Sequence, residues 1–132
     1  RQPVAGTIAR GYLPYPFKGE PDLAGEKLVN PIPISKESLQ LGQSKFDIYC
    51  SPCHGYQAEG DSRMRGHFPN PPSLHSEKVR KWSDGRIYAI LTDGQNIMPS
   101  HSSQLSVDER WAVINYVRAL QRALNAKESD LQ

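Results

Sequence analysis

The sequence has few apolar residues for its length. Hydrophobic residues make up 37% of the 132 positions, whereas a soluble domain usually has about 45–50%. The chain is long enough for one compact domain with an arm, but too short for two ordinary domains or for a large enzyme with a wide active-site cleft. Its own side chains would build only a thin core, and we expect another group to fill it.

The sequence also lacks a large net charge and long apolar runs. Sixteen Lys and Arg residues against fourteen Asp and Glu residues leave a formal net charge of +2, which does not favour a nucleic-acid or polyanion binder. The longest apolar stretch, residues 87–91, is interrupted by Tyr88, so we expect no transmembrane helix. No secretory signal is found at Arg1, although a leader or anchor removed earlier would leave the same start.

Proline and glycine are concentrated at the beginning of the chain. Six of the eleven prolines lie within residues 1–33, interleaved with four glycines. Because proline lacks a backbone donor and disfavours helix in the residue before it, we predict an extended, irregular arm over residues 1–34. The arm carries apolar side chains with which it could lie along a surface, its own or a partner's: Tyr12, Leu13, Tyr15 and Phe17.

Beyond the arm the pattern becomes helical, and we divide the chain into the arm, a domain over residues 35–126 and a tail over 127–132. A first helix is predicted over residues 36–49 after an N-cap at Ser35, and a second over 84–93, between Ser83 and Gly94. The last helix begins at the capping box of residues 106–109. Its apolar stripe recurs every three or four residues, at Trp111, Ile114, Val117, Leu120 and Leu124. Residues 55–81 are predicted as a long loop that needs something to enclose.

The only two cysteines belong to one motif, Cys50-Ser51-Pro52-Cys53-His54. A bare Cys-x-x-Cys could be a redox disulfide, half of a zinc site or a haem attachment site. The adjoining histidine favours c-type haem attachment. At this spacing both thiols can add to the two vinyl groups on one porphyrin edge, and His54 then becomes the proximal axial ligand.

The two alternatives fit the sequence less well. A redox dithiol usually follows a strand in a βαβ pattern, and no strand signal precedes Cys50. Zinc would need two further ligands from His54, His67, His75 or His101, at spacings that match no familiar zinc finger. One covalently attached haem c also accounts for the thin core and the long loop.

A haem held by His54 on one side needs a second axial ligand from another part of the chain. Met64 follows His54 by only ten residues, whereas Met98 follows it by 44 and stands beside Pro99, which stiffens its loop. A core role for Met98 and iron ligation by His101, His67 or His75 are the weaker alternatives. With His54 and Met98 as ligands, no position is open for oxygen or peroxide chemistry. The expected function is single-electron transfer at a raised reduction potential, not catalysis.

These residues together resemble class I cytochrome c, a small all-α fold wrapped around one covalently attached haem. The resemblance covers residues 35–126 and matches the attachment motif and the late methionine. It implies two further haem contacts: the Pro72 carbonyl accepts a hydrogen bond from Nδ1 of His54, and Leu74 packs on the haem. It also implies that the first and last helices cross at Gly42 and Phe46, opposite Trp111 and Tyr116.

A narrower resemblance involves residues 3–11, 30–33 and 108–120, which are similar to the monohaem cytochrome c subunit of bacterial alternative complex III. It implies a subunit of a membrane quinol-oxidising complex that passes electrons to a soluble carrier, an acceptor cytochrome or a terminal oxidase. Such a subunit lies on the periplasmic side of the bacterial cytoplasmic membrane, held by a lipid anchor or by partner subunits, and the arm would contact those subunits. The alternatives are a free periplasmic carrier and a haem sensor or enzyme domain with a labile sixth ligand.

Basic residues gather at the end of the long loop and just beyond it, at Lys78, Arg80, Lys81 and Arg86. They could form a docking patch, bind haem propionates or face solvent as an ordinary charged surface.

Overall fold

The structure is a computed structural model that describes residues 4, 6–8, 10, 14–64, 66–67 and 69–128. These residues form helices and no strand, apart from an isolated bridge between Gln95 and Met98. The helices are α1 (Pro21–Lys27), α2 (Lys36–Tyr49), α3 (Ser51–His54), α4 (Glu77–Arg80), α5 (Asp84–Asp93) and α6 (Val107–Leu124). The predicted all-α class and the predicted bounds of α2 and α5 are confirmed, as is the capping box that begins α6.

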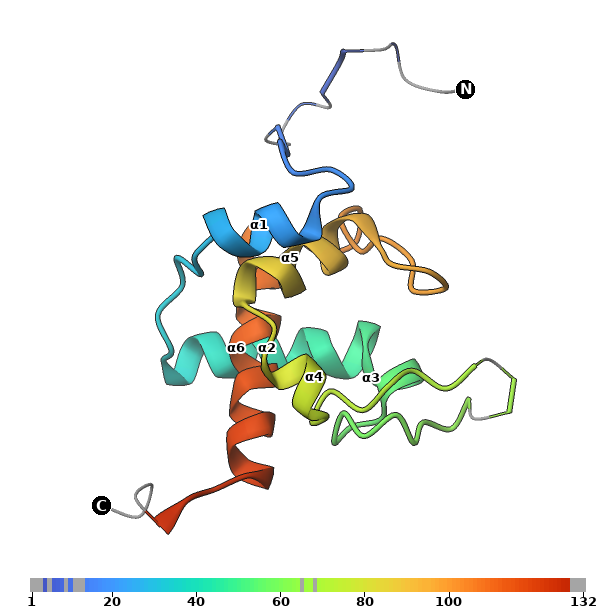
Figure 1. The fold of residues 1–132 in the computed structure, drawn as a ribbon, viewed down its shortest axis with the longest axis vertical. Helices are drawn as coiled ribbons and strands as arrows, with labels where there is room; N and C mark the ends of the chain where they lie inside the picture. The colour runs from blue at the N-terminus through green and yellow to red at the C-terminus, as the bar shows by residue number, and fades with distance from the viewer. Residues whose placement is uncertain are drawn as a thin grey trace.

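The crossing of α2 and α6 forms the centre of the fold (Figure 1). Gly42 allows it, because a Cβ at this position would overlap the carbonyl oxygen of Ala112 and lie 2.9 Å from Cβ of Tyr116. One turn further along α2, the buried ring of Phe46 meets Tyr116 edge-on at a centroid distance of 5.5 Å. The expected crossing is therefore present at Gly42, Phe46 and Tyr116.

Trp111 has a different partner from the one expected. Its ring stacks on Tyr88 of α5, with centroids 4.1 Å apart and planes inclined by 15°. The pair joins α5 to α6 and continues into the core, which includes Leu91, Ile114 and Val117. Trp111 thus fixes α5 rather than α2.

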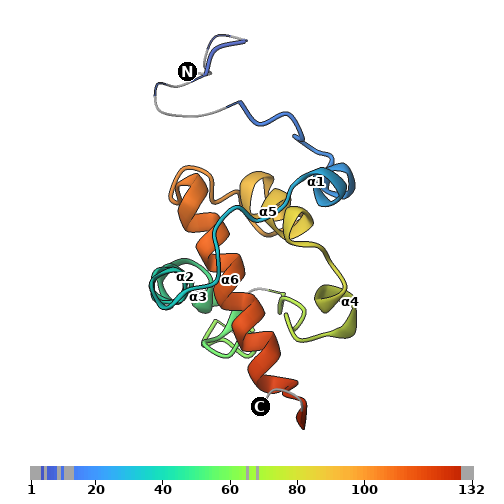
Figure 2. The same ribbon diagram turned by 90° about the vertical axis from the view of Figure 1, so that its left-hand side faces the viewer.

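The prediction of an extended arm is wrong for residues 21–27, which form α1 along α5 (Figures 1 and 2). Pro21 stands in the first turn of this helix, where no backbone donor is needed. Ala24 is fully buried against α5, and Gly85 allows the approach because a Cβ there would lie 2.7 Å from the Leu28 carbonyl oxygen. A hydrogen bond of 2.9 Å from Ser83 Oγ to the Gly25 carbonyl adds to this contact.

The residues on either side of α1 also contact the domain. Nδ2 of Asn30 donates to Oδ1 of Asn115 on α6 at 2.9 Å, and Nδ2 of Asn115 donates to the Ile32 carbonyl at 3.0 Å. Tyr15 packs on Tyr88 with a centroid distance of 6.2 Å. Tyr15 therefore contacts its own domain, while Tyr12 and Leu13 lie outside the described residues.

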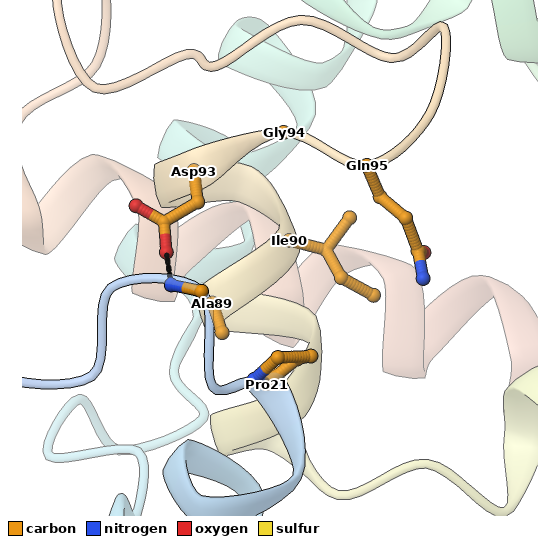
Figure 3. A pocket seen from close by; sticks show the side chains of 7 residues that line it. Pro21, Ala89, Ile90, Asp93, Gly94 and Gln95 are labelled. Carbon is orange, nitrogen blue, oxygen red and sulfur yellow. Dashed lines mark hydrogen bonds between the residues drawn. The ribbon is translucent and has the colours of Figure 1, made fainter.

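The segment before α1 closes against the end of α5 and leaves a hollow of about 200 Å³ (Figure 3). The backbone N–H of Gly19 donates to Oδ2 of Asp93 at 3.0 Å, the bond drawn in Figure 3. The residues that line the hollow are Gly19, Pro21, Ala89, Ile90, Asp93, Gly94 and Gln95. None of them belongs to the Cys-x-x-Cys-His motif.

The long loop is shorter than predicted, because Glu77–Arg80 form α4 after an N-cap at Ser76. This single turn could not be predicted from the sequence, because four residues are too few for a periodic apolar pattern. Within the described part of the chain, no helix combines the length and the apolar character that a membrane span requires.

Candidate haem site

The Cys-x-x-Cys-His motif forms one helical turn at the end of α2. The backbone N–H of Cys50 donates to the Phe46 carbonyl at 2.9 Å, so Cys50 still belongs to the hydrogen-bond ladder of α2. The backbone N–H groups of Cys53 and His54 then donate back to the Cys50 carbonyl at 3.2 and 2.9 Å. Gly55, with φ of +77°, ends the turn. The three predicted haem-binding side chains therefore project from one compact turn.

The two thiols are both free, but their surroundings differ. Cys50 is buried, with 6% of its surface exposed, whereas Cys53 is exposed. Burial raises the pKa of the Cys50 thiol to about 12. The activated thiol of a redox pair has a lowered pKa, and Cys50 does not lie in such an environment. No group of three or more His, Cys, Asp and Glu side chains suited to a metal ion is found among the described residues.

His54 is half-buried and has an unsatisfied ring nitrogen. Its Nδ1 atom is buried and has no hydrogen-bond partner in the described part of the chain. Burial and, second, the charge of His101 hold the pKa of His54 below its usual value. The neutral imidazole thus favoured is the form that binds metals. A half-buried imidazole whose Nδ1 has no partner among the described residues, next to two free thiols, is the donor set that haem c requires, so the residues fit this cofactor.

The loop after the motif folds back toward it. The backbone N–H of Gly60 donates to the His54 carbonyl at 2.8 Å, and a Cβ at Gly60 would lie 2.5 Å from the Pro71 carbonyl oxygen. The backbone N–H of Leu74 donates to Ala58, and the Leu74 carbonyl accepts from Nε2 of Gln121 at 2.6 Å. Leu74 is half-buried against the core. The bond from Nδ1 of His54 to the Pro72 carbonyl is not made here, and the haem contacts of Pro72 and Leu74 stay predictions.

Met98 lies in the loop between α5 and α6. Its backbone N–H and carbonyl both pair with Gln95, at 2.9 and 3.0 Å, in a tight turn after Gly94. The Met98 side chain is half-buried and packs against the core. Its ligation of iron stays a prediction.

The other candidate ligands occupy different surroundings. Met64 and His67 are exposed, and Nε2 of His75 lies 2.6 Å from the Gln57 carbonyl oxygen. The sequence alone does not favour His101 as a ligand, yet its charge lowers the pKa of His54, second to burial. Its place three residues after Met98, on the same loop, is the sequence signal that could have drawn attention to it.

Part of the basic group is already paired within the domain. Arg86 forms an ion pair with Asp22 of α1, and its guanidinium lies 4.9 Å from the Trp82 ring centroid. Lys81 pairs with Glu77 at 2.5 Å on the exposed side of α4. The Arg86 side chain therefore helps to hold α1 in place.

A helical domain in which α2 crosses α6, with a Cys-x-x-Cys-His turn at the end of α2, has the architecture of a c-type cytochrome. Residues 37–117 match the family described as "Cytochrome C oxidase, cbb3-type, subunit III", and the chain belongs to this family of cytochrome c domains. Membership implies haem c as the cofactor and electron transfer as the general role.

Two of the solved structures that are similar to the chain show the range of relatives. The first is from the reducing HAO-like protein complex of Kuenenia stuttgartiensis, with 26% identity and a TM-score of 0.58 over 70% of this chain and 49% of that one. The second is cytochrome cL from Methylophaga aminisulfidivorans, with 24% identity and a TM-score of 0.52 over 70% and 59%. The chain thus spans about half the length of the structures that it matches. No curated protein sequence matches it.

Proposed function

We propose that the chain transfers single electrons through one haem c, which is attached by thioether bonds to Cys50 and Cys53. The observation that carries the proposal is the free Cys-x-x-Cys turn beside the half-buried His54, whose buried Nδ1 has no partner among the described residues, in a chain of the cytochrome c family. When bound, the haem supplies a one-electron iron couple. His54 and Met98 are the proposed axial ligands, which raise its reduction potential relative to two histidines.

Two further residues serve this site in the proposal. With haem bound, the Pro72 carbonyl would accept the Nδ1–H of His54, a bond that is absent here, and would fix the orientation of the imidazole, while Leu74 would exclude water on the same side. The folded-back loop supports both roles, since its 58–60 and 71–74 segments are joined to each other and to the His54 carbonyl.

We further propose that the protein acts as a subunit of a membrane quinol-oxidising complex of the alternative complex III type. It would lie on the periplasmic side and pass electrons to a soluble carrier or a terminal oxidase. The similarity of residues 3–11, 30–33 and 108–120 supports this assignment. The similar structure from Kuenenia stuttgartiensis also comes from a protein complex.

A free periplasmic carrier is the second candidate, and one observation favours it. Tyr15, α1 and Asn30 all contact the domain itself, so much of the expected arm is already engaged. Only residues 1–13 keep the role of a possible partner-binding segment in the subunit proposal.

The test of the haem assignment is an optical spectrum of the purified, matured protein in both redox states, with a pyridine haemochrome assay. We expect a c-type spectrum with the weak far-red sulfur-to-iron band, and loss of that band in Met98→Ala. A protein without haem after maturation would contradict the cofactor, and rapid carbon monoxide binding to the reduced protein would instead favour the sensor or enzyme alternative.

A further inference from the structure

We propose that Arg110 binds a small monovalent anion inside the domain, with the Tyr88 hydroxyl as a second donor. The anion is either a carboxylate of the bound haem or an inorganic ion taken from solution, because a guanidinium recognises both by the same chemistry. The inference goes beyond the proposed function, and it rests on haem binding only for the first of these two sources.

Arg110 stands in the first turn of α6, yet it is buried, with 6% of its surface exposed. A guanidinium carries a permanent positive charge and several N–H donors. Nη2 donates to the Tyr88 hydroxyl at 2.9 Å, whereas Nε and Nη1 are buried and have no hydrogen-bond partner among the described residues. A buried charge in this state is costly, because no other bond replaces the water that it loses.

Tyr88 of α5 forms one wall of the site. Its hydroxyl accepts the bond from Arg110, which leaves its own hydrogen for a further acceptor. The Cζ atom of Arg110 lies 4.9 Å from the Tyr88 ring centroid, and Trp111 stacks on the same ring at 4.1 Å. This cation–π contact offsets only part of the cost of a buried charge. A guanidinium and a phenol thus meet at one buried place where α5 contacts α6 (Figure 2).

The carboxylates of neighbouring turns are engaged elsewhere. Glu109 pairs with Lys45 of α2 at 2.9 Å, and Oδ2 of Asp93 accepts from the backbone N–H of Gly19 at 3.0 Å. Within the described part of the chain, no ion pair joins Arg110 to a carboxylate. A small anion that accepts from the guanidinium and from the phenol would neutralise this charge and satisfy its donors.

The test uses the full-length, matured protein as wild type and as three variants: Arg110→Met, Tyr88→Phe and Arg80→Met. Arg80→Met is the matched control, because it makes the same change at an exposed position of α4. The melting temperature is measured while bromide replaces the larger gluconate ion at constant ionic strength, and the reduction potential is measured against pH. A pyridine haemochrome assay checks haem attachment separately, so failure of the cofactor assignment is recognised independently of the anion site.

For an anion from solution, the melting temperatures of wild type and Arg80→Met should rise by about 5 °C for each tenfold increase in bromide above its dissociation constant. Tyr88→Phe should need more bromide for the same rise, and Arg110→Met should not respond. Crystals of the wild-type protein soaked in bromide should show anomalous scattering beside the Arg110 guanidinium.

For a carboxylate of the haem, bromide should affect wild type and all variants equally, and the reduction potential should carry the signal. A carboxylate that pairs with a guanidinium stays ionised at lower pH than a solvated one. Arg110→Met should therefore move the acid step in the potential upward by about 1 to 3 pH units. Arg80→Met should leave that step where it is in wild type.

The proposal is overturned if Arg110→Met equals wild type both in its bromide response and in its pH profile of the potential. Water alone would then satisfy Arg110. If Arg110→Met does not fold, Tyr88→Phe takes its place in both comparisons. Equal bromide responses and equal pH profiles of Tyr88→Phe and wild type would then overturn the proposal in the same way.

Discussion

Cys50 and Cys53 lie within one helical turn, yet one is buried and the other is exposed. The motif itself could be predicted from the sequence, because its chemistry depends on the spacing of five consecutive residues. The burial of Cys50 could not, since it depends on how the end of α2 packs in the fold. The electrostatic effect of His101 on the pKa of His54 could not be predicted either, because it depends on tertiary structure.

Tyr15 provides a test at the residue scale. Its hydroxyl is buried and has no partner among the residues that the structure describes, and burial, followed by the charge of Asp93, raises its pKa from 10.0 to about 12. A raised pKa means that the folded protein favours the neutral phenol. The resulting contribution to the free energy of unfolding is complete below pH 10 and is lost as the pH rises toward 12. We expect Tyr15→Phe to lose less stability than wild type over that pH range in thermal melts.

At neutral pH the same variant should be as stable as wild type or up to about 1 kcal/mol more stable, because an unmet polar group is removed. Tyr15→Ala is the control and should cost about 2 kcal/mol, since it also removes the ring that packs on Tyr88. A large loss in Tyr15→Phe would mean that the hydroxyl has a partner after all.

The helices differ in how well the sequence predicts them. The bounds of α2 and α5 follow from local signals, an N-cap serine at the start and, for α5, a glycine at the end. α1 could not be predicted because the many prolines and glycines of residues 1–34 argue against helix, although Pro21 occupies the one turn that tolerates it. The stabilising contact of α1, through Gly85 of α5, comes from a distant part of the chain.

The crossing of α2 and α6 supplies a test at the element scale. Gly42→Ala places a methyl group against the Ala112 carbonyl, which must push the two helices apart. We expect a loss of about 3 kcal/mol in the free energy of unfolding, measured by chemical denaturation. Gln40→Ala, at an exposed position of the same helix, should change stability by less than about 0.5 kcal/mol. Equal stability of the two variants would contradict the close approach.

The N-terminus of α6 gives a pH-dependent test. The hydrogen bond from Lys45, followed by the backbone N–H of Ser106, holds the pKa of Glu109 below its usual value of 4.5. Because the pKa of Glu109 is lowered in the folded protein, its ionised side chain stabilises the fold at pH values above 4.5. This stabilisation is lost as the pH falls through the pKa of the folded state. We expect Glu109→Gln to melt at a lower temperature than wild type at pH 7, with the difference vanishing in acid.

Asp108→Asn is the control for Glu109. It removes a charge from the same first turn but from an exposed carboxylate. Its effect should therefore be smaller at pH 7, and an equal effect would indicate that only the helix dipole matters.

At the scale of the whole molecule, the low apolar content could be interpreted from the sequence, whereas the position of the arm could not. The shortage of apolar residues pointed to a group that completes the core, and the cytochrome c family supplies one in haem c. The arm was interpreted from composition alone. Its contacts depend on Asn115 of α6 and Tyr88 of α5, which lie far along the chain.

Two deletions separate the structural and the partner-binding roles of the first residues. Removal of residues 1–34 uncovers α5 and leaves Asn115 without Asn30, so we expect a clearly lower melting temperature. Removal of residues 1–13 spares these contacts and should leave the melting temperature and the haem spectrum unchanged. Under the subunit proposal, the shorter deletion tests partner binding without disturbing the domain. The measurement is co-purification of the complex.

If the protein without residues 1–34 melts like wild type, α1 does not stabilise the domain. If the protein without residues 1–13 still assembles with its partners, the subunit interface lies elsewhere or the protein is a free carrier.

The burial of Cys50 sets an order of events during biosynthesis. A thiol with a pKa of about 12 and 6% of its surface exposed hardly reacts at neutral pH. We therefore expect its bond to a haem vinyl group to form while the chain is still open, before the end of α2 is enclosed. A chain that folds first would offer haem only Cys53, so late addition of haem should yield a product with one thioether bond instead of two.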